Sequence, residues 1–147
     1  MNSADAIFYR EGYAGNWIHV TGALKQVTVG KLGVFGVNPN DQIFYRTGTM
    51  EDPKSAGSGW QHLPGALKYI SSGKSTIWGV NSADQIFYMK NLKNNNGILA
   101  FEWIHVAGGL KQISCAPGTY KLLPIYGKNR QLWNPDLKLN FAGILKI

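Results

Sequence analysis

The sequence predicts an all-β protein built of β-propeller blades, each of four antiparallel strands, in a partial (open) ring of three to four blades. Three observations predict it. Residues 60–88 repeat residues 17–45 almost without a gap, 43 residues later, and a third copy opens at Trp103. Within each copy, apolar and polar residues alternate with a period of two between short turn sequences. Four short strands in a repeat of about 40–45 residues are typical of a propeller blade.

The first full copy shows why each strand is expected. Four runs have strand periodicity, at 17–20, 24–29, 34–37 and 43–46. A turn bounded by Gly30 and Gly33 separates the middle two runs. The sequence Asn38-Pro39-Asn40-Asp41 separates the last two, since proline suits the second turn position and Asn or Asp side chains cap their own backbone. The copy therefore predicts a four-stranded meander.

The repeat also predicts where the units begin and end along the 147 residues. Residues 2–10 match the end of the central copy at seven of nine positions, so they are expected to be the last strand of a blade. Full blades are expected at 17–46 and 60–90, a degenerate blade at 103–133, and the start of the next blade at 137–147. The polar linkers 47–59 and 91–102 are expected as surface loops between blades.

The recurring aromatic and glycine positions are interpreted first as packing. Trp17, Trp60 and Trp103 suit the bulky wedge that each blade needs against its neighbour. Gly36 and Gly79 lie inside a predicted strand, where glycine usually marks a bulge or a close backbone approach. A direct contact of these residues with a ligand is the less favoured interpretation.

Composition and charge exclude several classes of function. The formal net charge of +7 favours anionic partners, but the cations are scattered singly and no recognition motif accompanies them, which argues against nucleic-acid binding. No apolar run reaches about 18 residues, so no membrane span is expected, and no signal peptide is visible. Cys115, the one cysteine, cannot form an internal disulfide and is expected to be a small buried hydrophobe rather than a reactive thiol.

The sequence predicts no enzyme and no metal site. There is no nucleophile elbow, no phosphate-binding glycine loop before a helix and no recurring carboxylate pair. The three histidines, His19, His62 and His105, lie 43 residues apart on different blades, so a shared metal would require them to converge on the propeller axis. A half-buried histidine bonded to a neighbour is the favoured interpretation.

A repeated polar turn followed by an aromatic strand is the candidate binding element. Amide and carboxylate groups beside an aromatic face suit the hydroxyls and the apolar face of a sugar ring. Equivalent sites on successive blades would also give avidity for repetitive glycans. The alternative is that Asn and Asp cap the turn while Gln ties blade to blade. The candidate sugar-binding residues are Asn38, Asp41, Gln42, Tyr45, Asn81, Asp84, Gln85 and Tyr88, together with His19 and His62.

These motifs carry a family resemblance. The Trp/His/Gly-x-Leu-Lys element, followed by Gly-Val-Asn-x-x-Asp-Gln-Ile-Phe-Tyr, resembles the tectonin β-propeller repeat, and most closely its fish-egg lectins. The resemblance is specific over residues 2 to about 114 and patchy beyond. It implies a secreted lectin of innate or egg defence that binds N-acetylglucosamine- or mannose-type sugars and bacterial lipopolysaccharide at or between blades. Calcium is a possible cofactor by the same resemblance.

Two further interpretations follow from the resemblance and the repeat count. Other tectonin-repeat proteins are similar intracellular scaffolds that bind proteins or membranes, which is the alternative function. Family members of this type close a six-bladed ring, whereas about three and a half units are present here. Exposed edge strands invite pairing, so two interpretations stay open: two copies complete one ring as a homodimer, or the chain is a truncated, decayed fragment without activity.

Overall fold

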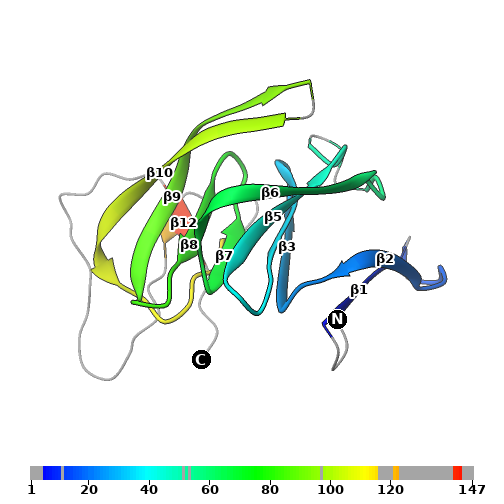
Figure 1. The fold of residues 1–147 in the computed structure, drawn as a ribbon, viewed down its shortest axis with the longest axis horizontal. Coiled ribbons are helices and arrows are strands. Elements are labelled where there is room, and N and C mark those ends of the chain that lie inside the picture. The colour runs from blue at the N-terminus through cyan, green and yellow to red at the C-terminus, as the bar shows by residue number, and fades with distance from the viewer. Residues whose placement is uncertain are drawn as a thin grey trace.

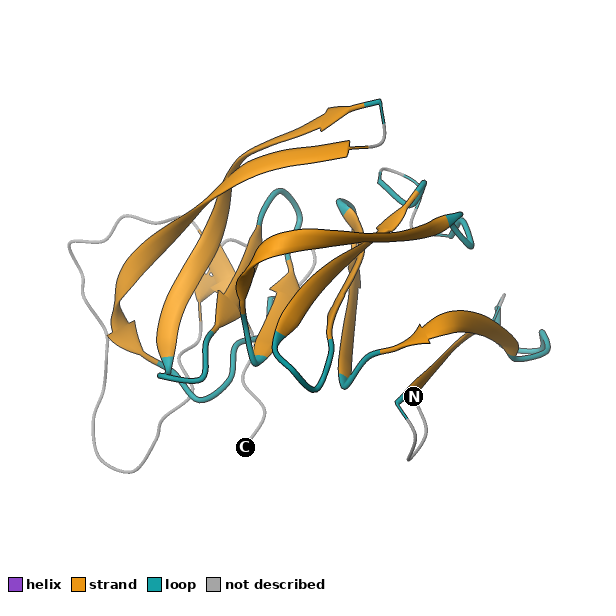
Figure 2. Ribbon diagram, viewed as in Figure 1, coloured by secondary structure: helices purple, strands orange, loops and turns teal. Residues whose placement is uncertain are grey.

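A computed structural model shows the chain as a row of twisted β-sheets (Figures 1 and 2). The structure describes residues 5–10, 12–50, 52, 54–96, 98–115, 121–122 and 141–143. These residues contain strands and no helix, so none of them forms a helix that could cross a membrane. The predicted all-β class and the open arrangement of four-stranded antiparallel sheets are confirmed.

Three antiparallel sheets follow one another along the chain. Sheet I pairs β1 (Ala6–Tyr9) with β2 (Ile18–Ala23). Sheet II contains β3 (Gln26–Gly30), β4 (Gly33–Val37), β5 (Gln42–Thr47) and β6 (Gly59–Ala66) in that order. Sheet III repeats it with β7 (Tyr69–Ser72), β8 (Ile77–Val80), β9 (Gln85–Asn95) and β10 (Ile98–Gly109). A short parallel pair, β11 (Lys121–Leu122) and β12 (Phe141–Gly143), follows.

The sheets divide the chain one strand later than the expected units. The strand that begins each sequence copy, at Trp60 or Trp103, is hydrogen-bonded to the last strand of the preceding copy. The complete sheets therefore run over 26–66 and 69–109 instead of 17–46 and 60–90. A tight antiparallel register along β5–β6 and β9–β10 causes the shift, because it makes the first strand of each copy the outer strand of the sheet before it. The expected units at 103–133 and 137–147 lie largely outside the described residues.

The two expected linkers are connections within a sheet. Most of residues 91–102 belong to β9 and β10, which form a long hairpin that projects beyond the other strands (Figure 1). Alternation of polar and apolar residues here (Leu92, Leu99 and Phe101 turned toward the core) is enough for strand pairing, so the prediction of a loop was wrong. In the first linker, Ser58 N–H donates to the Thr47 carbonyl at 2.9 Å and Arg46 Nε to the Ala56 carbonyl at 2.9 Å.

Alternation along β5 and β6 gives sheet II two apolar faces. Ile43, Tyr45 and Leu63 turn toward sheet III and belong to the largest core cluster, where all three are fully buried. Phe44 and Trp60 turn the other way and pack against sheet I. Sheet II is thus covered on both faces by its neighbours, as a blade is in a propeller.

The tryptophans that open the second and third copies hold adjacent sheets together. Trp60 donates its indole N–H to the Thr21 carbonyl of β2 at 2.7 Å, and Trp103 donates to the Pro64 carbonyl of β6 at 2.9 Å. Each ring also packs against the core between the two sheets. The packing interpretation of Trp60 and Trp103 is therefore confirmed.

Gly36 and Gly79 each lie inside a strand, at a point where the leucine that precedes the first strand of the same sheet packs closely against the backbone. A Cβ atom added at Gly79 would lie 2.2 Å from Cδ1 of Leu67, and one at Gly36 would lie 2.5 Å from Cδ1 of Leu24. Both leucines are buried, at 2% and 3% exposure, so neither can move aside easily. Only glycine leaves room for them.

We expect Gly79→Ala to lower the free energy of unfolding by about 1–3 kcal/mol, because the added methyl group overpacks the core at Leu67. The control is Gly59→Ala, where the new methyl group meets only Thr47 Oγ1 at 3.5 Å. This control should be neutral or slightly stabilising, by less than about 1 kcal/mol. Urea denaturation of both variants measures the difference, and equal stabilities would contradict the close-approach role.

Candidate functional site

The two polar turns predicted as sugar sites are occupied by their own hydrogen bonds. Asn38 Oδ1 accepts the N–H groups of Asn40 and Gln42 at 3.1 and 2.9 Å, and its Nδ2 donates to Gln42 Oε1 at 2.8 Å. The second turn repeats these bonds with Asn81, Ala83 and Gln85 at the same distances. Asn therefore caps the turn, as the alternative interpretation held, while Gln bonds to Asn rather than tying blade to blade.

The aspartates of these turns join consecutive sheets. Asp41 and Asp84 have left-handed backbones, with φ of 62° and 64°. Their carbonyls accept the N–H groups of Leu67 and Leu110 at 2.9 Å. The carboxylate of Asp41 is paired with Lys25.

Asp84 is paired with two lysines, one from each neighbouring segment. Lys68 enters sheet III and Lys111 follows it, and both ammonium groups contact the carboxylate. The hydrogen bond from Lys111, followed by that from Lys68, lowers the pKa of Asp84 below its usual value of 3.8. The carboxylate is thus engaged in a structural ion pair.

The two tyrosines of the predicted site differ from what was expected. Tyr45 is fully buried: its ring packs against Phe35 at 5.1 Å and its hydroxyl accepts the Met50 N–H. It cannot offer a face to a sugar, so this part of the prediction was wrong. Tyr88 is half-buried and packs against Trp78 at 5.1 Å. Side chains alternate between the two faces of β5, and this alternation places Tyr45 on the face that packs against sheet III.

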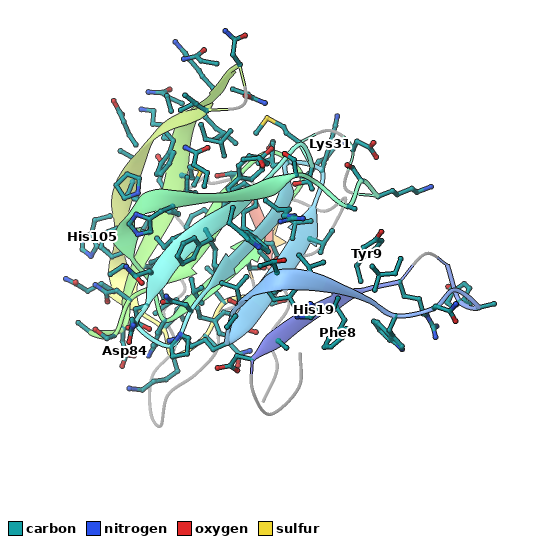
Figure 3. The ribbon with its side chains drawn as sticks, turned by 45° about the vertical axis from the view of Figure 1, so that its right-hand side comes forward. Phe8, Tyr9, His19, Lys31, Asp84 and His105 are labelled. Atoms are coloured by element: carbon teal, nitrogen blue, oxygen red, sulfur yellow. The ribbon has the colours of Figure 1, made fainter. Side chains whose placement is uncertain are left out.

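His19 and His62 are exposed and each lies against a phenylalanine of the adjacent strand. The ring centroids of Phe8 and His19, both labelled in Figure 3, are 5.2 Å apart. Those of Phe44 and His62 are 5.3 Å apart. His105 repeats the arrangement on sheet III. Among the described residues, no group of three or more His, Cys, Asp or Glu side chains could hold a metal ion.

Cys115 lies beside sheet III. Its N–H donates to Ser71 Oγ at 2.7 Å, and its thiol lies 3.7 Å from the Ser71 carbonyl oxygen. Burial raises the pKa of the thiol, which lowers the fraction of reactive thiolate at neutral pH.

A cleft of about 900 Å³ lies between sheet I and sheet II, within the size range of small-ligand sites. Its lining combines aliphatic side chains from both sheets with aromatic rings and cations. The aliphatic residues are Ile7, Val20, Val27, Val29 and Val34. The aromatic residues are Phe8, Tyr9, Tyr13, Trp17 and Trp60, and the cationic ones are Arg10, Arg46 and Lys54. None of the described residues that line the cleft is acidic.

Two arginine–tryptophan pairs line this cleft. The Arg10 guanidinium lies 5.1 Å from the Trp17 ring and that of Arg46 lies 5.2 Å from the Trp60 ring, both within cation–π distance. Trp60 is tied to sheet I, whereas Trp17 is 66% exposed. At the third equivalent position Met89 is paired with Trp103, so the cationic pair is confined to the first two copies.

Exposed aromatic rings gather at this end of the molecule. Among the described residues, the exposed large aromatics are Phe8, Tyr13 and Trp17, all on or between β1 and β2. Figure 3 labels Phe8 and its neighbour Tyr9 on β1. Open rings beside cations can bind a flat apolar face that carries negative charge.

Sequence reasoning assigned the tryptophans to packing and did not single out the arginines. The available signal was Phe-Tyr-Arg, which ends the aromatic strand in the first two copies, at Arg10 and Arg46. The paired tryptophan follows Arg10 by 7 positions and Arg46 by 14 positions. Because this separation varies, the pairing is set by the register of the two strands and is not visible as a fixed spacing.

Comparison with known proteins gives one match. The model of the Tectonin domain family matches residues 1–131, which is most of the chain. No curated protein matches. The match indicates a β-propeller domain of a lectin-like or interaction type, a class that is not enzymatic.

The ion pairs of Asp84 make stability depend on pH. A carboxyl whose pKa is lowered by folding contributes stability above its unfolded pKa, and this contribution is lost as the pH falls through the lowered folded value. We therefore expect Asp84→Asn, which keeps the left-handed backbone, to lower the urea midpoint at pH 7, with a difference that shrinks below about pH 4. Asp52→Asn, at an exposed carboxylate, is the control and should change neither value. A difference for Asp84→Asn that is independent of pH would contradict the assignment.

Proposed function

The chain belongs to the Tectonin domain family, and on this premise we propose that it is a carbohydrate-binding lectin. The proposed ligands are microbial surface glycans and lipopolysaccharide that carry N-acetylglucosamine- or mannose-type sugars, and the proposed role is innate or egg defence. Such ligands are met outside the cell, so we propose a secreted protein.

The observation that carries the proposal is the exposed Trp17 ring with Arg10 beside it at the mouth of the cleft. Sugar rings bind proteins by laying an apolar face on an aromatic ring while their hydroxyls bond to polar groups. Trp17 is open for this contact, since 66% of its surface is accessible.

The charge of the cleft favours anionic glycans over neutral ones. Arg10, Arg46 and Lys54 line it without a carboxylate among the described lining residues. Arginine binds phosphate through two parallel hydrogen bonds, and lysine adds a point charge. A phosphorylated sugar of lipopolysaccharide could stack its ring on Trp17 while its phosphate contacts the cationic side chains. The protein's net charge of +7 would add attraction at long range.

The first test is a screen of glycans and lipopolysaccharide, with free N-acetylglucosamine as competitor, run with calcium and with a chelator. We expect Trp17→Ala to weaken binding by about 2- to 10-fold, the loss of one stacking contact. Ile18→Ala is the matched control: Ile18 is also exposed, at 45%, but does not line the cleft. A folded protein that binds none of these ligands would overturn the lectin proposal, and equal loss in both variants would overturn the site.

The second test separates charge from stacking. Arg10→Gln combined with Lys54→Gln should weaken lipopolysaccharide binding and flatten its dependence on salt concentration. The same double variant should leave binding of free N-acetylglucosamine nearly unchanged. Lys90→Gln with Lys93→Gln, on the β9–β10 hairpin away from the cleft, removes the same charge as a control. Equal effects of the two double variants would mean that only net charge matters.

A further inference from the structure

Consecutive units are joined by a repeated bond between a hydroxyl and a backbone N–H. Thr28 Oγ1 accepts the N–H of Ser72 at 2.9 Å, and Ser71 Oγ accepts the N–H of Cys115 at 2.7 Å. Thr28, Ser71 and Ser114 occupy equivalent positions of the repeat, as do Val29, Ser72 and Cys115. One unit therefore supplies the hydroxyl and the next supplies the amide.

A second bond of the same kind accompanies the first. The Gln26 side chain donates Nε2 to the Ile70 carbonyl at 2.6 Å and accepts the Ile70 N–H at 2.8 Å. The inner strand β7 is thereby held along its free edge by side chains of β3. Tyr69 replaces Gln26 in the following unit, and Gln112 restores the glutamine in the unit after it.

Within the described residues, this series ends with an unpaired group on each side. The Val29 N–H at the start has no hydroxyl partner, and the Ser114 hydroxyl at the end has no amide partner. The register shows where Val29 points: it lies opposite Val34 as Ser72 lies opposite Ile77. Because the Ser72 N–H points away from β8, the Val29 N–H points away from β4 into the cleft.

The apolar side chains beside this unpaired N–H group are also more exposed than their equivalents in the next unit, which are buried. Val29 is 58% exposed, whereas its equivalent Ser72 is 6% exposed beneath sheet II. Val27 lines the cleft, whereas its equivalent Ile70 is fully buried. The free edge of β3 thus has the chemistry of a surface that a unit of this same chain covers elsewhere.

We infer that the free edge of β3 binds the segment Gln112–Cys115 of a second copy, and that two copies close head to tail into one ring. In this contact the Ser114 hydroxyl of one copy accepts the Val29 N–H of the other. Its Gln112 amide, which also donates to the Tyr69 hydroxyl of its own chain, reaches the backbone of Val27.

The first and last members of this described series carry complementary groups, which is the condition for a head-to-tail contact. Such a contact uses a different patch on each partner and closes only if the rotation brings the second pair of ends together. In a ring of two copies, the 112–115 segment of each copy contacts β3 of the other, which gives two identical contacts. The segment would cover Val27 and Val29 on β3 and leave Arg10 and Trp17, which lie outside β3, accessible. The inference therefore does not rest on the sugar-binding proposal.

The test is the mass of the protein in solution, measured by light scattering over a range of concentrations. We expect twice the 16.2 kDa of one chain. Val29→Asp should weaken the dimer at least about tenfold, because it would place a carboxylate in an apolar contact. Ile98→Asp is the matched control, an exposed aliphatic strand residue (66%) remote from β3, and should change dimerisation by less than about twofold.

Hydrogen exchange keeps the test decisive if a variant folds poorly. In the unchanged protein, the amides of Val27 and Val29 should become protected as concentration rises and dimer forms. A monomeric mass at all concentrations overturns the inference. So does a dimer that Val29→Asp leaves intact. Protection of Val29 at monomer concentrations would mean that the chain's own residues cover β3, which overturns it as well.

Discussion

The arrangement of the sheets depends on one recurring backbone hydrogen bond, from the leucine that enters each sheet to the aspartate of the preceding turn. Leu24, Leu67 and Leu110 donate to the carbonyls of Asp5, Asp41 and Asp84, in each case at 2.9 Å. The aspartate reaches this position only because its backbone is left-handed, a conformation that Asp and Asn tolerate better than most residues. The leucine is then fixed over the strand glycine. Sheet-to-sheet geometry follows from this junction, and the tryptophan and glutamine bonds reinforce it.

The same junction explains why the fold class was predictable from the sequence while the sheet boundaries were not. A period of 43 residues, with strand alternation and turn residues, is sufficient for the class. Which strand pairs with which depends on the connection at 48–58, which turns the chain back so that β6 pairs with β5, with a shift of register between Gln42 and Ile43. Sequence similarity marks the residue at which the repeated pattern restarts. That residue lies one strand before the first strand of the hydrogen-bonded sheet. The polar character of residues 91–102 concealed a hairpin for a similar reason, since two exposed strands need few apolar residues.

The candidate site was only partly visible in the sequence. Conspicuous repeated residues, Asn38 and Asp41 above all, proved to satisfy one another or the lysines beside them. A motif that recurs unchanged in every unit serves a structural role common to all units, and here that role is to join consecutive sheets. The binding features differ between units instead: Arg10 and Arg46 have a methionine as their third equivalent, and Trp17 alone of its set is largely open. Residues that depart from the repeat carry more information about a ligand than those that keep it.

The offset between sequence copy and sheet has a consequence for how the chain is made. During synthesis from the N-terminus, sheet II lacks its outer strand until residues 59–66, the first strand of the next copy, have left the ribosome. A single copy does not contain a complete four-stranded sheet, since it supplies three strands to one sheet and one to another. Growth of such a chain by tandem gene duplication would preserve every junction, because a whole copy inserted anywhere receives an outer strand from its successor and donates one to its predecessor.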